Sequence, residues 1–171
     1  NISIVSNIAE KIDFNDRAVY LEGVKSPLKY DYLVLASGAT SDYSIAGSKD
    51  FAYFLKTLDD AIKLKNKILS LFSEASKTTD SKSQKALLSF VVIGGGATAF
   101  EMVTELEEYI FGALAEKYHD TISLDNISIT LITSGHEILK QFSPSIRKSA
   151  KKNLSNKKIY IKYNSPVASI S

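Results

Sequence analysis

The residues best placed to do chemistry form a glycine-rich turn. Gly94, Gly96 and Ala99 have the spacing G-x-G-x-x-A, directly after the apolar run 87–93. In such a turn the first glycine allows a sharp change of direction, the second lets the backbone approach a pyrophosphate, and the small third residue lets a helix pack closely on the strand. The N–H groups at the start of that helix then face the phosphate charge. The motif predicts a dinucleotide site at Gly94, Gly95, Gly96, Ala97 and Thr98, and the alternative is a turn that only packs.

The elements around this turn are expected to place it at one edge of a parallel sheet. Apolar runs at residues 87–93, 127–132 and 158–163 predict strands. Helices are expected over residues 57–73 and 97–118, and from Ser143, where a Ser-Pro pair favours a helix start. The polar stretch 73–85 predicts a mobile surface loop. Strands that alternate with helices indicate βαβ units.

The N-terminal part of the chain is expected to consist of strands. Residues 17–21 and 32–36 are rich in the β-branched, aromatic and aliphatic residues that strands prefer. The second run is almost wholly apolar, which is typical of a strand buried on both faces. Residues 1–12 also resemble residues 159–170 weakly. We hypothesise from this that the N-terminal strands take edge positions in the sheet that holds the glycine turn.

The composition excludes several kinds of chemistry. The 171 residues are 44% hydrophobic and 23% charged, which is typical of a soluble globular protein. The absence of cysteine excludes disulfides, thiolate metal sites and cysteine nucleophiles, and the two distant histidines do not favour a metal site. No run approaches the ~18 apolar residues of a membrane span and no secretory signal is recognised, so a cytoplasmic location is expected. The start at Asn1, with Met102 the only methionine, predicts an excised or processed piece.

Charge is distributed unevenly along the chain. Residues 140–171 contain eight lysines and arginines and no acidic residue, whereas the remainder has 13 basic against 19 acidic residues. Such a basic end can attract phosphates, an acidic membrane or nucleic acid. We favour a solvated helix face beside a lysine-rich turn, the usual situation of charge runs, and expect no nucleic-acid partner because no reading module accompanies it. Glu105, Glu107 and Glu108 are likewise expected to form a solvated face.

Several segments resemble a known family. Residues 30–39 (YDYLVLASGA) are similar to the YDYLVLATG segment of two-dinucleotide flavoproteins, the pyridine nucleotide-disulfide oxidoreductase superfamily. Residues 92–101 (VIGGGATAFE) resemble the VVGGGPTGVE motif of its type II NADH dehydrogenases, and residues 138–142 (ILKQF) resemble their ILPxF motif. The resemblance covers nearly the whole chain.

This resemblance implies a fold and a domain organisation. The fold would be α/β, a Rossmann-like parallel sheet with helices on both faces, plus a short N-terminal β segment of an FAD domain. Residues 1–46 would be that partial FAD-domain segment, and residues 47–171 an NAD(P)H-binding domain truncated at its C-terminal end. Gly38, at the end of the first motif, joins the expected cofactor-binding residues. FAD would be bound only by the full-length protein, with the FAD domain of the same parent chain as partner.

The resemblance also implies a reaction. NADH or NADPH would lie across residues 94–98 and pass a hydride to FAD, and the electrons would then go to a quinone or another acceptor. The parent would be an FAD-dependent NAD(P)H dehydrogenase, peripheral on the inner face of the cell membrane, and the fragment alone is expected to be inactive. Glu101 matches a glutamate found where nicotinamide meets flavin, which makes it the expected catalytic residue. The alternative is that its charge only stabilises the helix N-terminus. The sequence leaves open whether the protein forms a homodimer.

Thr133 and Ser134 leave the choice of coenzyme undecided. Thr133 stands where these enzymes often carry a glutamate that bonds the adenosine ribose and repels a 2′-phosphate. With Ser134 it completes the expected cofactor-binding residues. A neutral residue at this position weakens the preference for NADH and admits NADPH.

Two other functions remain compatible with the sequence. One is another FAD-dependent reductase of the superfamily, such as a sulfide:quinone, ferredoxin or disulfide reductase. The other is a degenerate, non-catalytic nucleotide-binding or interaction module. The departures at Ala97, Ala99 and Thr133 from the family motif give this second alternative some support, and it predicts no saturable binding of either coenzyme.

Overall fold

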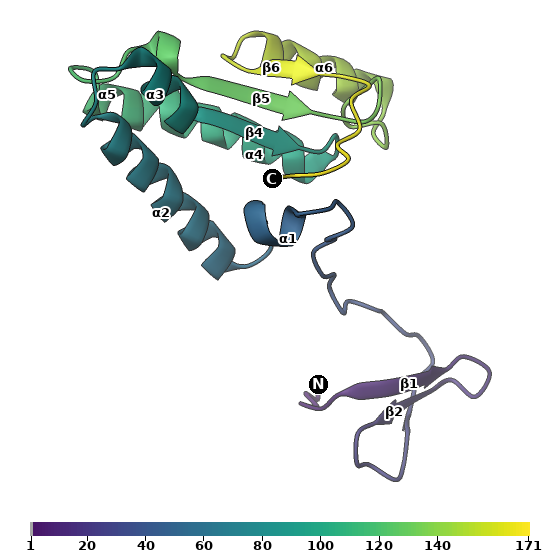
Figure 1. Ribbon diagram of the computed structural model, residues 1–171. Coiled ribbons are helices and arrows are strands. Elements are labelled where there is room, and N and C mark those ends of the chain that lie inside the picture. Colours follow the sequence, from purple (N-terminus) through teal and green to yellow (C-terminus); the bar gives the residue numbers. More distant parts are fainter. Residues whose placement is uncertain (1) are drawn as a thin grey trace. The chain divides into compact units, whose positions relative to one another are not determined.

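The chain folds as two compact units. The computed structural model describes residues 2–171, and the contacts divide the chain between Ala39 and Thr40 (Figure 1). The predicted domain division between residues 46 and 47 stays a prediction, because compactness alone does not show to which parent domain the residues between 40 and 46 belong.

The N-terminal unit contains a small antiparallel sheet in the order β1-β2-β3. Its strands are β1 (Ala9–Asp13), β2 (Ala18–Leu21) and β3 (Leu28–Lys29). Asp13 closes the turn between β1 and β2, because its Oδ1 accepts the N–H groups of Asp16 at 3.0 Å and Asn15 at 3.1 Å. The hydrogen bond from Asp16 is the main reason that the pKa of Asp13 lies below its usual value.

Two expectations for this unit are wrong. Within the described residues, β1, β2 and β3 pair only with one another and not with the sheet that holds the glycine turn. A short turn between neighbouring strands favours antiparallel pairing, whereas a place in a parallel sheet needs a long crossover. Residues 32–36 form no strand, and Tyr32 is 94% exposed and Val34 86% exposed. An apolar run becomes a strand only where a neighbour takes up its backbone hydrogen bonds, and no segment of residues 2–171 does so.

The larger unit is a parallel sheet in the order β4-β5-β6 flanked by helices, which confirms the α/β, Rossmann-like prediction (Figure 1). Its strands are β4 (Ser89–Ile93), β5 (Ser128–Ile132) and β6 (Tyr160–Lys162). Its helices are α1 (Ser48–Phe51), α2 (Leu58–Ala75), α3 (Ser81–Leu87), α4 (Ala97–Tyr109), the π-helical η1 (Ile110–Leu114), α5 (Ala115–Lys117), the 3₁₀-helical η2 (Leu124–Asn126) and α6 (Pro144–Ser155). Because α4, η1 and α5 follow one another directly, they make up the long helix expected over residues 97–118.

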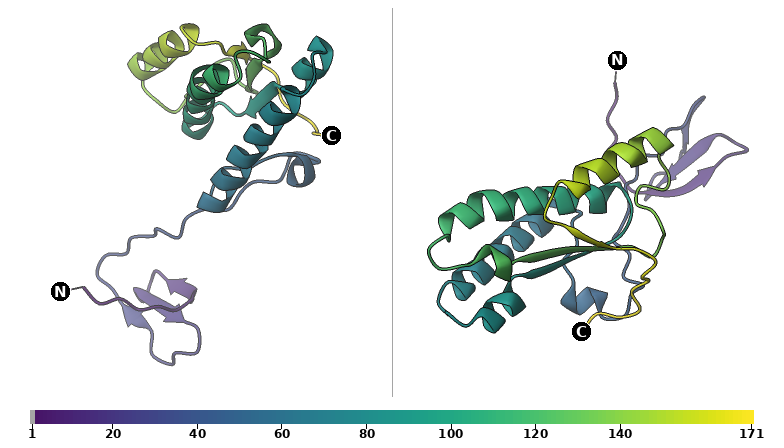
Figure 2. Two further views of the ribbon diagram at one scale, coloured as in Figure 1. Left: turned by 90° about the vertical axis from the view of Figure 1, so that its left-hand side faces the viewer. Right: turned by 90° about the horizontal axis from the view of Figure 1, so that it is seen from above.

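The core lies against one face of this sheet, along which α4 and α6 both run (Figure 2). Side chains alternate along a strand, and Phe90 of β4 is in register with Ile129 of β5, so both point to the same face. Phe72 of α2 stacks on Phe90, with ring centroids 6.3 Å apart. The core also contains the buried residues Leu88, Val103, Leu106, Ile110, Leu131 and Leu154.

Helices α2 and α6 begin where the sequence predicts. Thr57 Oγ1 accepts the N–H of Asp60 at 3.2 Å, and an Asp60 carboxylate oxygen accepts the N–H of Thr57 at 2.9 Å, which is a capping box. Ser143 precedes α6 as its N-cap residue and Pro144 occupies the first turn, although the Ser143 hydroxyl makes no capping hydrogen bond. The start of each helix is therefore decided locally.

The expectation of a mobile loop over residues 73–85 is wrong for its second half. Helix α3 lies there and buries Gln84, whose side-chain amide donates to the carbonyl oxygens of Thr78 and Thr121, both at 2.8 Å. Asn126 in turn donates to Oε1 of Gln84 at 2.7 Å. Thr121 and Asn126 are distant from Gln84 in sequence, so no local pattern indicates that this polar segment is ordered.

Candidate functional site

The glycine turn joins the end of β4 to the start of α4 as its motif predicts. Gly94 has φ +139°, which residues with a Cβ rarely adopt, and its N–H donates to the carbonyl of Ile132 at the end of β5 at 2.8 Å. The position that a Gly94 Cβ would occupy lies 3.1 Å from the Cβ of Ala99. A small residue at position 99 therefore lets α4 approach the strand closely.

Gly95 contacts the loop that follows β5. A Cβ on Gly95 would lie 2.5 Å from Oγ1 of Thr133, a distance that real Cβ atoms essentially never show. The carbonyl of Gly95 also accepts the N–H of Leu139 at 2.6 Å. A side chain at position 95 would therefore force Thr133 or the turn to shift, and the structure brings the predicted residues Gly95 and Thr133 together.

Gly96 leaves the start of α4 open. The nearest atom to the position of its Cβ is Nε2 of Gln141, at 3.7 Å, which is an ordinary contact. Gly96 is the N-cap residue of α4 and provides no side-chain cap, so no side chain of residues 2–171 is seen to cap the first-turn N–H groups of the helix. Free N–H groups and the positive end of the helix dipole can together receive an anionic group.

The remaining predicted residues lie on α4, in the loop after β5 and in the N-terminal unit. Thr98 and Glu101 are both exposed on α4. They are three residues apart and are therefore neighbours on one face of the helix. Thr133 is buried and its Oγ1 accepts the N–H of Gly135 at 3.3 Å, whereas Ser134 is exposed. Gly38 belongs to the N-terminal unit, where it has φ +77° and no atom lies within 4 Å of its Cβ position.

An ion-pair cluster that the sequence did not predict adjoins the loop that follows β5. Glu137 pairs with Lys151 through Oε1 at 3.2 Å and with Arg147 through Oε2 at 3.3 Å, and both cations lie on α6. The hydrogen bond from Lys151, followed by the charge of Arg147, keeps the pKa of Glu137 below its usual value. The spacing of four residues between Arg147 and Lys151 places both on one helix face, and it is the only local signal of this cluster.

The expectation that Glu107 is part of a solvated face is wrong. Glu107 is buried on α4 and accepts hydrogen bonds from Nζ of Lys157 at 3.0 Å and from the N–H of Lys158 at 3.1 Å. Lys157 also contacts Glu108 at 2.7 Å, and this bond is the main reason that the pKa of Lys157 is raised. A buried carboxylate needs such partners, so Glu107 has a structural role between α4 and the turn before β6.

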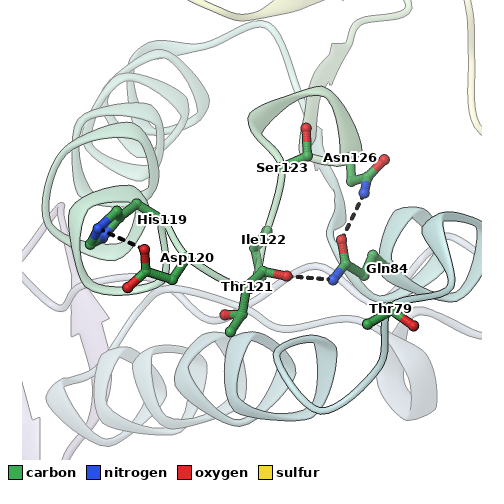
Figure 3. A pocket seen from close by; sticks show the side chains of 8 residues that line it. All are labelled: Thr79, Gln84, His119, Asp120, Thr121, Ile122, Ser123 and Asn126. Carbon is green, nitrogen blue, oxygen red and sulfur yellow. Dashed lines mark hydrogen bonds and ion pairs between the residues drawn. The ribbon is translucent and has the colours of Figure 1, made fainter.

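A separate pocket of about 380 Å³ lies among residues that precede β4 and β5, at the amino ends of the strands (Figure 3). Its lining residues are Thr79, Gln84, His119, Asp120, Thr121, Ile122, Ser123 and Asn126. Gln84 bonds Thr121 and Asn126, and His119 pairs with Asp120 at 3.1 Å. These polar groups mostly satisfy one another, whereas the glycine turn lies at the carboxyl ends, where open α/β sheets bind their ligands.

A parallel sheet with an open glycine turn at the carboxyl ends of its strands defines a Rossmann-like nucleotide-binding architecture. The chain belongs to the pyridine nucleotide-disulphide oxidoreductase family, whose model matches residues 2–171.

Individual relatives support the same assignment. The mitochondrial external alternative NAD(P)H-ubiquinone oxidoreductase B3 of Arabidopsis thaliana is 32% identical over 94% of this chain and 29% of its own length. The type II NADH:quinone oxidoreductase NdhA of Mycobacterium tuberculosis is 27% identical over 99% of this chain and 37% of its own length. The structure of NDH2 from Plasmodium falciparum in complex with NADH has a TM-score of 0.75 at 28% identity, over 98% of this chain and 34% of that chain. The chain therefore spans about a third of the length of these proteins.

The contact between Gly95 and Thr133 gives a first prediction. Gly95→Ala should lower the free energy of unfolding by about 1–3 kcal/mol, because its Cβ would meet the Thr133 hydroxyl, whereas Gly96→Ala, at an open position, should change it by less than about 1 kcal/mol. Thr133→Ala removes the hydroxyl and should restore part of the loss in the double variant. Urea unfolding of the four proteins measures this, and equal effects at positions 95 and 96 would contradict it.

The ion pairs of Glu137 predict a pH dependence of stability. Its pKa in the folded chain lies below the ordinary value of 4.5, so its contribution is fully present above that pH and is lost as the pH falls through the folded pKa. Glu137→Gln should therefore be less stable than the unsubstituted chain at pH 7. This difference in stability should disappear as the pH is lowered. Glu116→Gln, at an exposed position, is the control. Thermal unfolding between pH 7 and pH 3 tests this, and a constant difference would count against it.

Proposed function

We propose that this chain is the NAD(P)H-binding part of an FAD-dependent dehydrogenase that passes electrons to a quinone. The observation that carries the proposal is the uncapped start of α4 beside Gly96, at the carboxyl edge of a parallel sheet. The coenzyme pyrophosphate would be received by the backbone of Gly94, Gly95, Gly96, Ala97 and Thr98. The names of the relatives, which are NAD(P)H-ubiquinone and NADH:quinone oxidoreductases, support the reaction class.

The coenzyme would supply a hydride, and the protein would supply position and charge. Helix α4 would stabilise the pyrophosphate through its free N–H groups and its dipole. Thr98 and Glu101 lie on the same exposed face of α4, so both can contact the part of the coenzyme that follows the pyrophosphate. In this assignment the Glu101 carboxylate accepts hydrogen bonds from the nicotinamide carboxamide and orients the ring.

Residues 1–46 would be the part of this chain that contributes to the FAD domain. The fit rests on Gly38, which has a positive φ and open space at its Cβ position, so its backbone can be approached closely by a ligand. FAD, held with the rest of the FAD domain of the parent protein, would accept the hydride. Gly38 is accordingly proposed as a cofactor-binding residue.

The proposal includes the cellular setting of the parent protein. We infer a cytoplasmic protein, bound peripherally to the inner face of the cell membrane, where a quinone acceptor would be accessible. Helices α1 to α6, all within residues 2–171, include none that combines the length and the apolar character of a membrane span. A homodimer is compatible with the proposal and is not required by it.

Gly96→Val tests the coenzyme site. The added Cβ meets no tight contact within the protein, and the valine methyl groups should occupy the space proposed for the pyrophosphate, so NADH binding in calorimetry at low ionic strength should fall at least tenfold. Gly112→Ala, which also places its Cβ in open space, is the control and should leave binding unchanged. Circular dichroism checks that both variants fold. Undiminished NADH binding by a folded Gly96→Val chain would refute the assignment. If the unsubstituted chain of 171 residues binds no NADH, the non-catalytic module is favoured.

Glu101→Gln tests the redox assignment in the full-length flavoprotein. Loss of the carboxylate should slow flavin reduction by NADH about tenfold or more in stopped-flow measurements, while the affinity for NADH changes less than about threefold. Glu105→Gln, one turn further along α4 and also exposed, should leave the rate unchanged. If Glu101 only stabilises the helix start, the variant will instead lose stability with an unchanged rate.

A further inference from the structure

A second recess lies at the end of the long helix that α4, η1 and α5 form. It has a volume of about 630 Å³ and adjoins the pocket of Figure 3, with which it shares His119, Ile122 and Ser123. Its other lining residues are Phe111, Gly112, Ala115, Glu116 and Leu124. The segment from Ile122 to Leu124 leads into β5, so the recess lies toward the amino ends of the strands, whereas the glycine turn lies at their carboxyl ends.

The helix leaves this recess open because its residues there are small. Ala115 and Glu116 follow Gly112 by three and four residues, so all three lie on one helix face. No atom lies within 4 Å of the position that a Gly112 Cβ would occupy. Gly112 also belongs to the π-helical segment η1, and such segments are rare and frequently lie at functional sites. The backbone at Gly112 is therefore accessible to a ligand.

Most of the wall of this recess is apolar. Ile122 is buried, Phe111 and Ala115 are half-buried, and Leu124 at the rim is 43% exposed. Covering apolar surface of this kind is favourable because it removes that surface from water. The volume of the recess falls within the range of roughly 300–1,000 Å³ that is usual for small-molecule sites. The recess therefore suits a ligand with an apolar body.

One carboxylate in this recess is available to a ligand. Glu116 has no ion-pair partner within residues 2–171, whereas Glu107 and Glu137 each have one. The neighbouring carboxylate of Asp120 pairs with Nε2 of His119 at 3.1 Å, and Nδ1 of His119 lies 2.8 Å from the carbonyl oxygen of Glu116. The last turn of the long helix adds the negative end of the helix dipole. The charge at this end of the recess therefore favours a cation.

The nearby lysines are directed to aromatic rings. Nζ of Lys117 lies 5.1 Å from the ring centroid of Tyr118, and Nζ of Lys158 lies 4.6 Å from that of Phe111. Because Lys158 already occupies one face of Phe111, this ring serves as apolar wall and not as the site for a second cation. Glu116 is then the group that can bind a positively charged ligand.

We propose that this recess binds a small amphiphilic cation, which is an aromatic or alkyl body that carries an ammonium group. The body lies on the apolar wall over the open backbone of Gly112, and the ammonium group donates hydrogen bonds to the Glu116 carboxylate. An anion of the same shape is repelled by that carboxylate. The proposal does not rest on the proposed function, because the recess and the glycine turn lie toward opposite ends of the strands.

Three probes with the same aromatic body test this proposal: naphthylethylammonium, the neutral naphthylethanol and the anion naphthylpropanoate. Each is titrated into the isotope-labelled chain of 171 residues, and the amide signals are followed by NMR. The ammonium probe should bind saturably, with its largest shifts at Gly112, Ala115 and Ile122. It should bind about threefold or more tightly than the alcohol and about tenfold or more tightly than the anion, and salt should reduce both differences.

Substitutions separate the charge from the apolar wall. Glu116→Gln should lower the affinity of the ammonium probe to that of the alcohol and leave the alcohol unchanged. Glu105→Gln, an exposed carboxylate of α4 outside the recess, is the matched control and should change neither. Gly112→Leu should fill the recess and weaken both probes about tenfold or more. Leu124→Ser, at an exposed rim position, should weaken both about threefold, so the result does not depend on the folding of Gly112→Leu alone.

Several outcomes would overturn the proposal. Equal affinity for the ammonium probe and the anion refutes the role of Glu116, and shifts spread over the chain without saturation refute a defined site. Unchanged binding by folded Gly112→Leu and Leu124→Ser chains refutes the location. NADH should not displace the probe, and displacement would place the probe in the coenzyme site instead. A chain that binds the probe in the recess but binds no NADH supports this inference and contradicts only the proposed function.

Discussion

The candidate site depends on one close approach, between the backbone of Gly95 and the loop that follows β5. The Gly95 carbonyl accepts the N–H of Leu139, and the hydroxyl of Thr133 occupies space that a Cβ at position 95 would need. Leu139 adopts φ +56° in this loop, a conformation that costs a residue with a Cβ about 1 kcal/mol or more. Its buried side chain offsets that cost, so core packing holds the loop against the turn.

The sheet register makes this approach possible. In the parallel pairing of β4 with β5, Ile93 lies opposite Ile132, so both strands end at the same level and the Gly94 N–H reaches the Ile132 carbonyl. The two following loops therefore start side by side. The core on the α4 face stabilises this arrangement, and the hydrogen bonds of Gln84 stabilise the amino ends. The carboxyl ends of the strands, where the glycine turn leaves backbone open, are thus separate from the amino ends, where the polar groups are hydrogen-bonded.

Charged residues connect segments that are distant in the chain. Glu107 binds Lys157, and Glu137 binds Arg147 and Lys151, so several cations of the basic end are partly buried partners of carboxylates. The expectation of a solvated helix face is therefore wrong for Arg147 of α6, and Lys157 in the lysine-rich turn is likewise partly buried. The Glu137 cluster adjoins the loop that meets the glycine turn, whereas the pairs of Glu107 join α4 to the turn before β6.

The sequence by itself determined the features that depend on near neighbours. The strand–glycine–helix turn, the capping box of Thr57 and Asp60, the alternation of strands with helices and the family resemblance were all predictable, because local spacing decides them. Only the tertiary structure decided the pairing of β1 to β3, the exposure of residues 32–36, the order of α3 and the partners of Glu107 and Glu137. Each of these depends on whether a distant segment supplies a hydrogen-bond or charge partner. The spacing of residues within one segment does not predict such a partner.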